Sequence, residues 1–139
     1  MLYNLNFGGE RLMNPDTLKY TEEHEWIVNL DGICIIGITE YAVDELGEIT
    51  FVELPEIGKV LERGEDVAVV ESVKAANDVY APVSGTVVEV NDILEMEPDL
   101  INRDCYGKGW IVKMKDINEE EYNELMDARS YRGYLKTVE

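Results

Sequence analysis

The fold is decided by Val70-Glu71-Ser72-Val73-Lys74-Ala75-Ala76-Asn77-Asp78-Val79-Tyr80-Ala81, which sets one lysine between two strand-like runs, Val67–Val73 and Asp78–Ala81. Stiff, β-rich flanks can hold the Lys74 amine at the tip of a hairpin, where a modifying enzyme can reach it. Acylation of that amine would remove its charge and lengthen the side chain. The spacing alone favours an ordinary solvated lysine, because hairpin lysines are common and modified ones are rare.

A β pattern continues on both sides of this stretch. Trp26–Leu30 and Ile33–Ile38 flank Asp31-Gly32, a two-residue connection that predicts a hairpin with a type I′ turn. Ile33–Ile38 is apolar without alternation, which indicates burial on both faces. A short helix is predicted over Glu40–Leu46, ended by Gly47. Further strands are predicted at Ile49–Leu54, Val67–Val73, Asp78–Ala81, Thr86–Val90 and Trp110–Lys115.

Some single residues carry structural expectations of their own. Phe51 and Trp110 are expected in the core, and Gly85 is expected to allow a positive φ in a Ser-Gly turn. After Ile117 the spacing of apolar residues becomes that of a helix. Asn118 is predicted to cap its N-terminus, and the Glu121 side chain is predicted to bond back to the Asn118 N–H. We predict one amphipathic C-terminal helix, docked on the β body by a face that comprises Tyr122, Leu125, Met126 and Arg129.

Length and charge limit the class of protein. A chain of 139 residues with 45% hydrophobic content fits one domain with a real core. The formal net charge of −18 disfavours nucleic acid or an anionic membrane as a partner, and no apolar run approaches the roughly 20 residues that span a bilayer. The excess of acidic residues either favours encounter with basic surfaces of partner proteins or simply keeps the protein soluble. We expect a soluble monomer.

The sequence gives little support to an enzymatic function. His24 is the single histidine, and the two cysteines lie far apart, so neither a His-based metal site nor a Cys-x-x-Cys pair is present. Cys34 lies in an apolar run that disfavours a thiolate, and nothing in the sequence brings His24 to Cys105. We expect a non-catalytic protein without a metal site. Two cysteines make no disulfide framework here, which favours a reducing compartment, with cytoplasm as the first choice.

Several blocks together resemble one family, the H protein of the glycine cleavage system. Val70–Gly85 is similar to its lipoyl-lysine segment. The blocks Leu18–Trp26, Gly37–Ala42, Leu46–Pro55 and Gly107–Trp110 follow the family's order and spacing. The resemblance runs from about Asn14 to about Tyr131. We therefore expect residues 1–13 to be a mobile leader segment and 14–139 to be a single carrier domain.

The resemblance implies a mainly β fold, a flattened barrel-sandwich hybrid with short helices, and lipoate attached through an amide to Lys74. It implies a shuttle that accepts an aminomethyl group from glycine decarboxylase (P protein) and presents it to aminomethyltransferase (T protein). Dihydrolipoamide dehydrogenase (L protein) then reoxidises the arm. The alternative left open is an H-like relay that donates lipoyl groups to other proteins. Family members in eukaryotes work in the mitochondrial matrix, so the resemblance leaves that compartment as the alternative to cytoplasm.

The resemblance also implies individual roles. Glu25 and Asp78 would face a cleft that protects the loaded arm, with Ile38 and Thr39 as part of its lining. Without the resemblance, Glu25 and Asp78 read as ordinary surface acids among 30. Glu71 would help the lipoate-attaching enzyme to recognise the correct lysine, or would simply face water at a strand end. His24 is expected to be a structural residue beside the cleft.

Two other classes of cofactor carrier differ from this sequence near the lysine, and the sequence departs from the H-protein pattern at Cys105. Biotin carriers typically flank their lysine with methionines, whereas Val73 and Ala75 stand here. Lipoyl domains of 2-oxoacid dehydrogenases typically have aspartate before the lysine and are tethered by linkers, so a free-standing carrier is expected. Cys105 stands where family members commonly have proline. This departure is either neutral loop variation or, if Cys105 is exposed, a thiol that could form a mixed disulfide with a reduced lipoyl arm.

Overall fold

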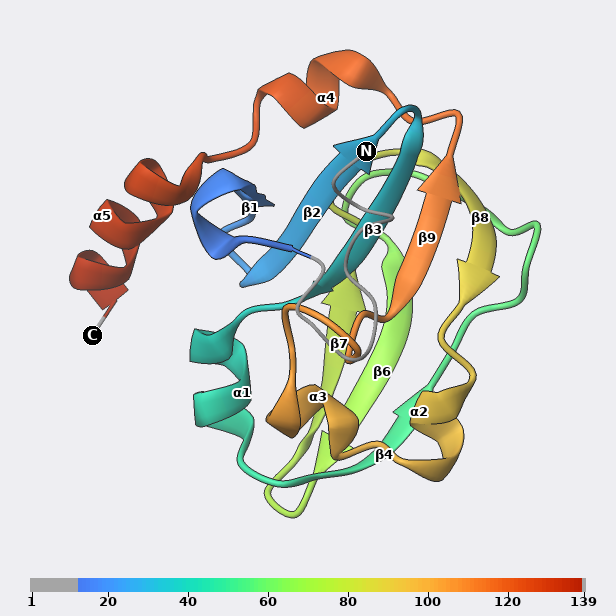
Figure 1. The fold of residues 1–139 in the computed structure, drawn as a ribbon, viewed down its shortest axis with the longest axis vertical. Coiled ribbons are helices and arrows are strands. Elements are labelled where there is room, and N and C mark those ends of the chain that lie inside the picture. Colours follow the sequence, from blue (N-terminus) through green and yellow to red (C-terminus); the bar gives the residue numbers. More distant parts are fainter. Residues whose placement is uncertain (1–12, 139) are drawn as a thin grey trace.

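Two antiparallel sheets form the body of the protein in the computed structural model, which describes residues 13–138 (Figure 1). The larger sheet has the order β1-β2-β3-β9-β8-β5, and the smaller has the order β4-β6-β7. The strands are β1 (Lys19–Tyr20), β2 (Glu25–Leu30), β3 (Ile33–Ile38), β4 (Ile49–Glu53), β5 (Val60–Leu61), β6 (Asp66–Ser72), β7 (Ala76–Tyr80), β8 (Gly85–Val90) and β9 (Val112–Lys115).

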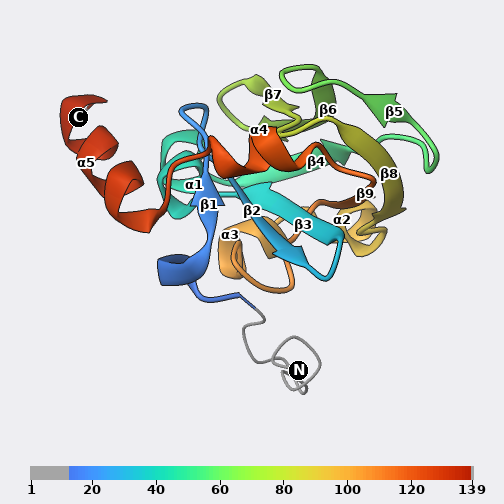
Figure 2. The same cartoon turned by 90° about the horizontal axis from the view of Figure 1, so that it is seen from above.

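Short helices surround this body. They are the 3₁₀ turn η2 (Pro15–Thr17) and the α-helices α1 (Glu40–Leu46), α2 (Ile93–Met96), α3 (Leu100–Arg103), α4 (Glu119–Asn123) and α5 (Ala128–Val138). Figure 2 shows the sheets as two layers, with α5 at one side next to β1. The predicted mainly β architecture with short helices is confirmed. Within residues 13–138, no helix is long and apolar enough to cross a membrane.

The core lies between the two sheets. Ile27, Ile36 and Met114 from the larger sheet share one buried cluster with Val52 and Val70 from the smaller. A second cluster covers the other side of β2 and β3 and joins Trp26 and Ile35 to Tyr131 of α5. Successive residues along β2 and β3 therefore pack into different clusters. Because both faces of β3 are buried in this way, its sequence is apolar without polar residues in between. Cys34–Ile38 are buried as predicted, while Ile33 is 37% exposed at the turn.

Local signals placed the first hairpin and the first helix correctly. Asp31 and Gly32 have φ values of 58° and 91°, the two positive values that a type I′ turn requires. The Thr39 hydroxyl accepts a hydrogen bond from the Ala42 N–H at 3.3 Å and caps α1. Gly47, at φ 76°, ends the helix where predicted.

The C-terminal prediction was wrong in detail. Asn118 caps α4 as expected, since its side chain accepts from the Glu121 N–H at 3.0 Å. The Glu121 carboxylate, however, accepts from the N–H and hydroxyl of Ser84 instead of returning to the cap. The helix stops at Asn123, and a bridge between Met126 and Tyr20 interrupts it before α5 begins. The predicted apolar face is thus split between α4, a connection and α5.

Three single-residue expectations also need correction. Phe51 is 50% exposed, because a bulge in β4 between Ile49 and Phe51 changes the alternation. Trp110 is half-buried at the edge of the second cluster. Gly85 has no positive φ; a Cβ there would lie 2.9 Å from the Lys115 carbonyl oxygen, so its role is close packing. The predicted leader lies outside the described residues except for Met13, which is buried in the second cluster.

Candidate functional site

Lys74 lies in the three-residue loop between β6 and β7, with an exposed side chain. Ser72 organises this loop. Its N–H donates to the Ala75 carbonyl at 2.8 Å, and its hydroxyl accepts from the N–H groups of Lys74 and Ala75 at 3.1 and 3.3 Å. Val73, which precedes the lysine, is 70% exposed. The backbone of the loop is therefore fixed while the lysine itself stays accessible.

The loop rests against the connection from α1 to β4, beside which it lies in Figure 1. The Val73 N–H donates to the Glu48 carbonyl at 3.3 Å. The Lys74 amine donates to the Glu45 carbonyl, near the end of α1, also at 3.3 Å. A Cβ on Gly47 would lie 3.5 Å from Lys74 Cε, so the lysine stem crosses directly over this glycine. The end of α1 and the following turn thus form a seat for the lysine hairpin.

A hollow of about 340 Å³ opens beside this seat. Four parts of the chain form its wall: the turn into β2 with the first residue of that strand, the end of β3, helix α1, and the pair β6 and β7. Its lining comprises Glu23, His24, Glu25, Ile38, Tyr41, Ala42, Glu45, Leu46, Val70, Asn77, Asp78, Val79 and Tyr80. Because Glu45 both lines the hollow and accepts from the Lys74 amine, Lys74 lies at its rim.

Glu25 is a buried carboxyl in the wall of the hollow, with only 2% of its surface exposed. One oxygen accepts from the Thr21 hydroxyl at 2.5 Å, and the other accepts from the Tyr80 N–H at 3.0 Å. Loss of hydration raises the pKa of Glu25 to about 7, although both hydrogen bonds oppose the shift. The pKa of this carboxyl therefore lies close to neutral pH.

The structure brings Glu25, Ile38 and Asp78 to the same hollow. Glu25 and Ile38 are register partners on β2 and β3, and Asp78 lies exposed on β7. Thr39 does not line the hollow; it is buried behind it, where it caps α1. Glu71 is partly buried in β6 and is not among the residues that line the hollow.

A tyrosine of α5 supports the hollow from behind. The Tyr131 hydroxyl lies 2.8 Å from His24 Nδ1 and 2.9 Å from the Thr39 hydroxyl, and its ring stacks on Tyr20. His24 has φ 72°, and burial lowers the pKa of its imidazole, which is therefore neutral near pH 7. Sequence reasoning missed Tyr131 because its partners are 107 and 92 residues away and no local pattern joins them.

Both cysteines are buried. Burial raises the pKa of the Cys34 thiol to about 12. Cys105 is 9% exposed, and its backbone carbonyl accepts from the Trp26 indole at 3.0 Å. The condition for a mixed disulfide through Cys105, an exposed thiol, is therefore not met in this fold. Among residues 13–138, no group of three or more His, Cys, Asp or Glu side chains could hold a metal ion.

Comparison with known proteins gives one consistent result. The family model described as glycine cleavage H-protein matches residues 18–138. A glycine cleavage system H protein from Thermus thermophilus is 51% identical over 123 residues, which cover 88% of this chain and 96% of the relative. A probable glycine cleavage system H protein from Pyrococcus furiosus is 56% identical over 123 residues, which cover 87% and 91%. The crystal structure of a glycine cleavage system H protein from Mycobacterium marinum matches with a TM-score of 0.77 at 38% identity, over 86% of this chain and 97% of that chain.

Proposed function

The chain belongs to the glycine cleavage H-protein family, and on that basis we propose that it carries a lipoyl group in amide linkage on the Lys74 amine. The protein is a lipoyl-carrying shuttle of the glycine cleavage system. The observation that carries the assignment to Lys74 is its position: an accessible amine, on a rigid loop, at the rim of a hollow. Within the described part of the chain, this amine makes one hydrogen bond and no ion pair, so little must be broken before acylation.

The hollow fits the proposed group. Ile38, Leu46, Val70 and Val79 supply apolar walls for an alkyl chain. Glu25 and Asp78 supply carboxyl groups for a cationic end. When bound, the lipoyl group supplies the disulfide that accepts the aminomethyl unit from glycine decarboxylase and yields it to aminomethyltransferase.

Glu25 and Asp78 hold the amine of the loaded arm in this proposal. An ammonium group near Glu25 lowers the pKa of this carboxyl, because a neighbouring positive charge favours the carboxylate. The Glu25 carboxyl would release its proton to solvent as the cation enters, and the resulting ion pair would be largely shielded from bulk water. Ile38 excludes solvent from the hollow, and Thr39 acts indirectly by capping α1.

The partners follow from this role. We propose the P, T and L proteins and a lipoate-attaching enzyme as partners of a monomeric, non-catalytic carrier in the cytoplasm. Glu71, which does not line the hollow, is available to the attaching enzyme while the lysine amine enters its active site. With a net charge of −18, encounter is favoured with partners whose active-site mouths are basic. The lipoyl-relay alternative needs the same lysine, but the relatives are named for glycine cleavage, which favours the shuttle.

The test uses a lysine variant in a reconstituted glycine cleavage assay with P, T and L proteins from a relative. Lys74→Ala should fold as the wild type does, because the loop is held by Ser72 and by backbone groups. It should abolish aminomethyl transfer to tetrahydrofolate. Lys59→Ala, which removes another exposed loop lysine, is the matched control and should retain full activity. Turnover by folded Lys74→Ala would refute the assignment.

A further inference from the structure

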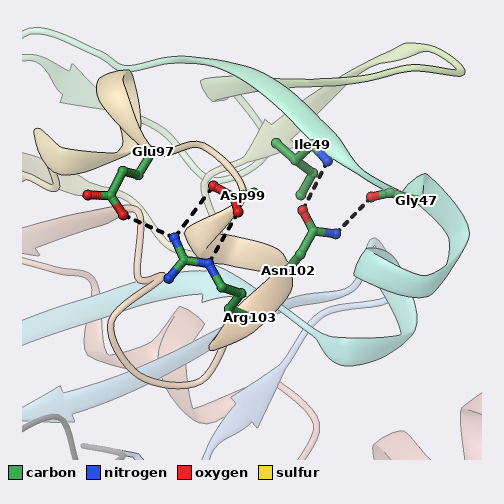
Figure 3. A network of polar contacts seen from close by, with 6 residues as sticks. All are labelled: Gly47, Ile49, Glu97, Asp99, Asn102 and Arg103. Atoms are coloured by element: carbon green, nitrogen blue, oxygen red, sulfur yellow. Dashed lines mark hydrogen bonds and ion pairs between the residues drawn. The ribbon is translucent and has the colours of Figure 1, made fainter.

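Asn102 joins helix α3 to the segment on which the lysine hairpin rests (Figure 3). Its side-chain amide donates to the Gly47 carbonyl at 2.9 Å, and its side-chain oxygen accepts from the Ile49 N–H at 2.9 Å. One partner is an acceptor and the other is a donor, so only an amide in this orientation satisfies both. The Asn102 amide therefore clamps the chain on either side of Glu48.

The clamped segment needs partners from outside itself. Gly47 ends α1 at φ 76°, and β4 is irregular between Ile49 and Phe51, so the regular strand ladder is interrupted here. Backbone groups that are removed from water cost free energy unless they are paired. Helix α3 is a firm base for the clamp, since Leu100 and Ile101 on the same turn are buried in the main core.

The segment between the two clamped groups contacts the lysine hairpin. Glu48 lies between Gly47 and Ile49, and its carbonyl accepts the Val73 N–H at 3.3 Å. The Lys74 stem crosses over Gly47, and the lysine amine donates to the Glu45 carbonyl. A shift of residues 47–49 would thus move the backbone contact of Val73 and the surface beneath Lys74 together.

We propose that Asn102 is a positioning residue for Lys74: it holds residues 47–49 so that the hairpin presents the amine in one orientation to the enzymes that use it. This inference rests on the proposed function of Lys74 as the lipoyl attachment point. Without the clamp, the hairpin samples several orientations, and only a fraction of molecules can dock productively. Such a fraction weakens apparent binding but leaves chemistry within the docked complex unchanged.

The experiment compares Asn102→Ala with a control on the same helical turn. The Arg103 side chain pairs with Glu97 and Asp99, which lie in the connection between α2 and α3, and Figure 3 draws no interaction between Arg103 and Gly47 or Ile49. Arg103→Ala therefore removes polar contacts from α3 without releasing the clamp. Initial rates of lipoylation are measured with a lipoate–protein ligase, lipoate and ATP, as the concentration of each full-length carrier is varied.

For Asn102→Ala, the KM for the carrier should rise about 3- to 10-fold, the ratio expected for loss of a typical hydrogen-bond contribution, while kcat stays within about twofold. Arg103→Ala should match the wild type in both constants. Amide hydrogen exchange gives a second readout that does not depend on lipoylation. The Val73 N–H should exchange about 10-fold faster in Asn102→Ala and at the wild-type rate in Arg103→Ala.

An unchanged KM, a fall in kcat alone, an unchanged Val73 exchange rate, or equal effects in both variants would overturn the proposal. If Asn102→Ala does not fold, Asn102→Asp replaces it, since it retains an acceptor for the Ile49 N–H at similar volume and loses the donor to Gly47. Its KM should rise as well, and an unchanged KM would again overturn the proposal. A wild-type protein that the ligase does not modify at Lys74 would instead refute the proposed function.

Discussion

Replacing Glu25 with glutamine should change how the stability of the protein depends on pH. The Glu25 carboxyl is buried between the Thr21 hydroxyl and the Tyr80 N–H, and loss of hydration raises its pKa from 4.5 to about 7. A group whose folded pKa lies above its unfolded value binds more protons in the folded state between those two pH values. Its contribution to stability is therefore fully present below pH 4.5 and is lost as the pH rises through 7.

The size of the effect follows from the shift. A displacement of about 2.5 pKa units at 1.36 kcal/mol per unit corresponds to about 3 kcal/mol of unfolding free energy. Glutamine is nearly the same size and stays neutral at every pH; its amide oxygen can accept from the Tyr80 N–H while its NH2 group donates to the Thr21 hydroxyl oxygen. The unfolding free energy of Glu25→Gln, relative to the wild type, should thus increase by about 3 kcal/mol between pH 4.5 and pH 8.

Urea unfolding of both proteins at half-unit pH steps measures this difference. The other acids are common to both proteins, so their contributions cancel in the comparison. Glu22→Gln is the control for the loss of one negative charge from the same turn, because Glu22 is exposed. If the difference in unfolding free energy between wild type and Glu25→Gln stays constant across the pH range, burial does not raise the pKa of Glu25.

Two further predictions concern the support of the hollow and the core. Tyr131→Phe keeps the ring stacked on Tyr20 but deprives His24 and Thr39 of the tyrosine hydroxyl, so it should lower the unfolding free energy by about 1 to 3 kcal/mol. Urea unfolding at pH 7 would detect this loss, and a variant as stable as the wild type would disprove a supporting role for the hydroxyl. Cys34, with its pKa raised to about 12 by burial, should resist a thiol-specific reagent at pH 8 in the native protein and react within minutes in urea. Rapid labelling of native Cys34, located by peptide mapping, would show that this part of the core opens readily.

Local sequence signals predicted the elements whose structure depends on neighbouring residues. Asp31-Gly32 demands two positive φ values, and α1 begins at the Thr39 cap and ends at Gly47, a glycine with positive φ. These features need no information from elsewhere in the chain. The hairpin that displays Lys74 is of the same kind, since it depends on stiff flanks and on Ser72 at the end of β6.

Features that depend on distant residues were not predictable. The C-terminal helix is interrupted by pairing of Met126 with Tyr20, and Phe51 is turned outward by a bulge relative to β6. Asn102 and Tyr131 gain their roles only when the chain brings their partners to them. Tertiary contacts override a local periodic pattern in such cases, because the pattern contains no record of the partner.

The resemblance to a family placed the site more sharply than residue patterns could. Glu25 and Asp78 were two acids among 30, and no spacing rule distinguishes them from the others. The fold brings both to one hollow beside the lysine, and it separates Thr39, which is buried behind that hollow. Burial of Glu25 results from the pairing of β2 with β3 and from contact with β7, which the sequence around Glu25 does not specify.

Peptide mass mapping of the protein purified from its own cells, grown with glycine, tests the central claim most directly. We expect a lipoyl adduct, in amide linkage, on the peptide that contains Lys74 and on no other lysine peptide. A biotin adduct at Lys74, or an unmodified Lys74 in cells with active lipoylation, would contradict the claim.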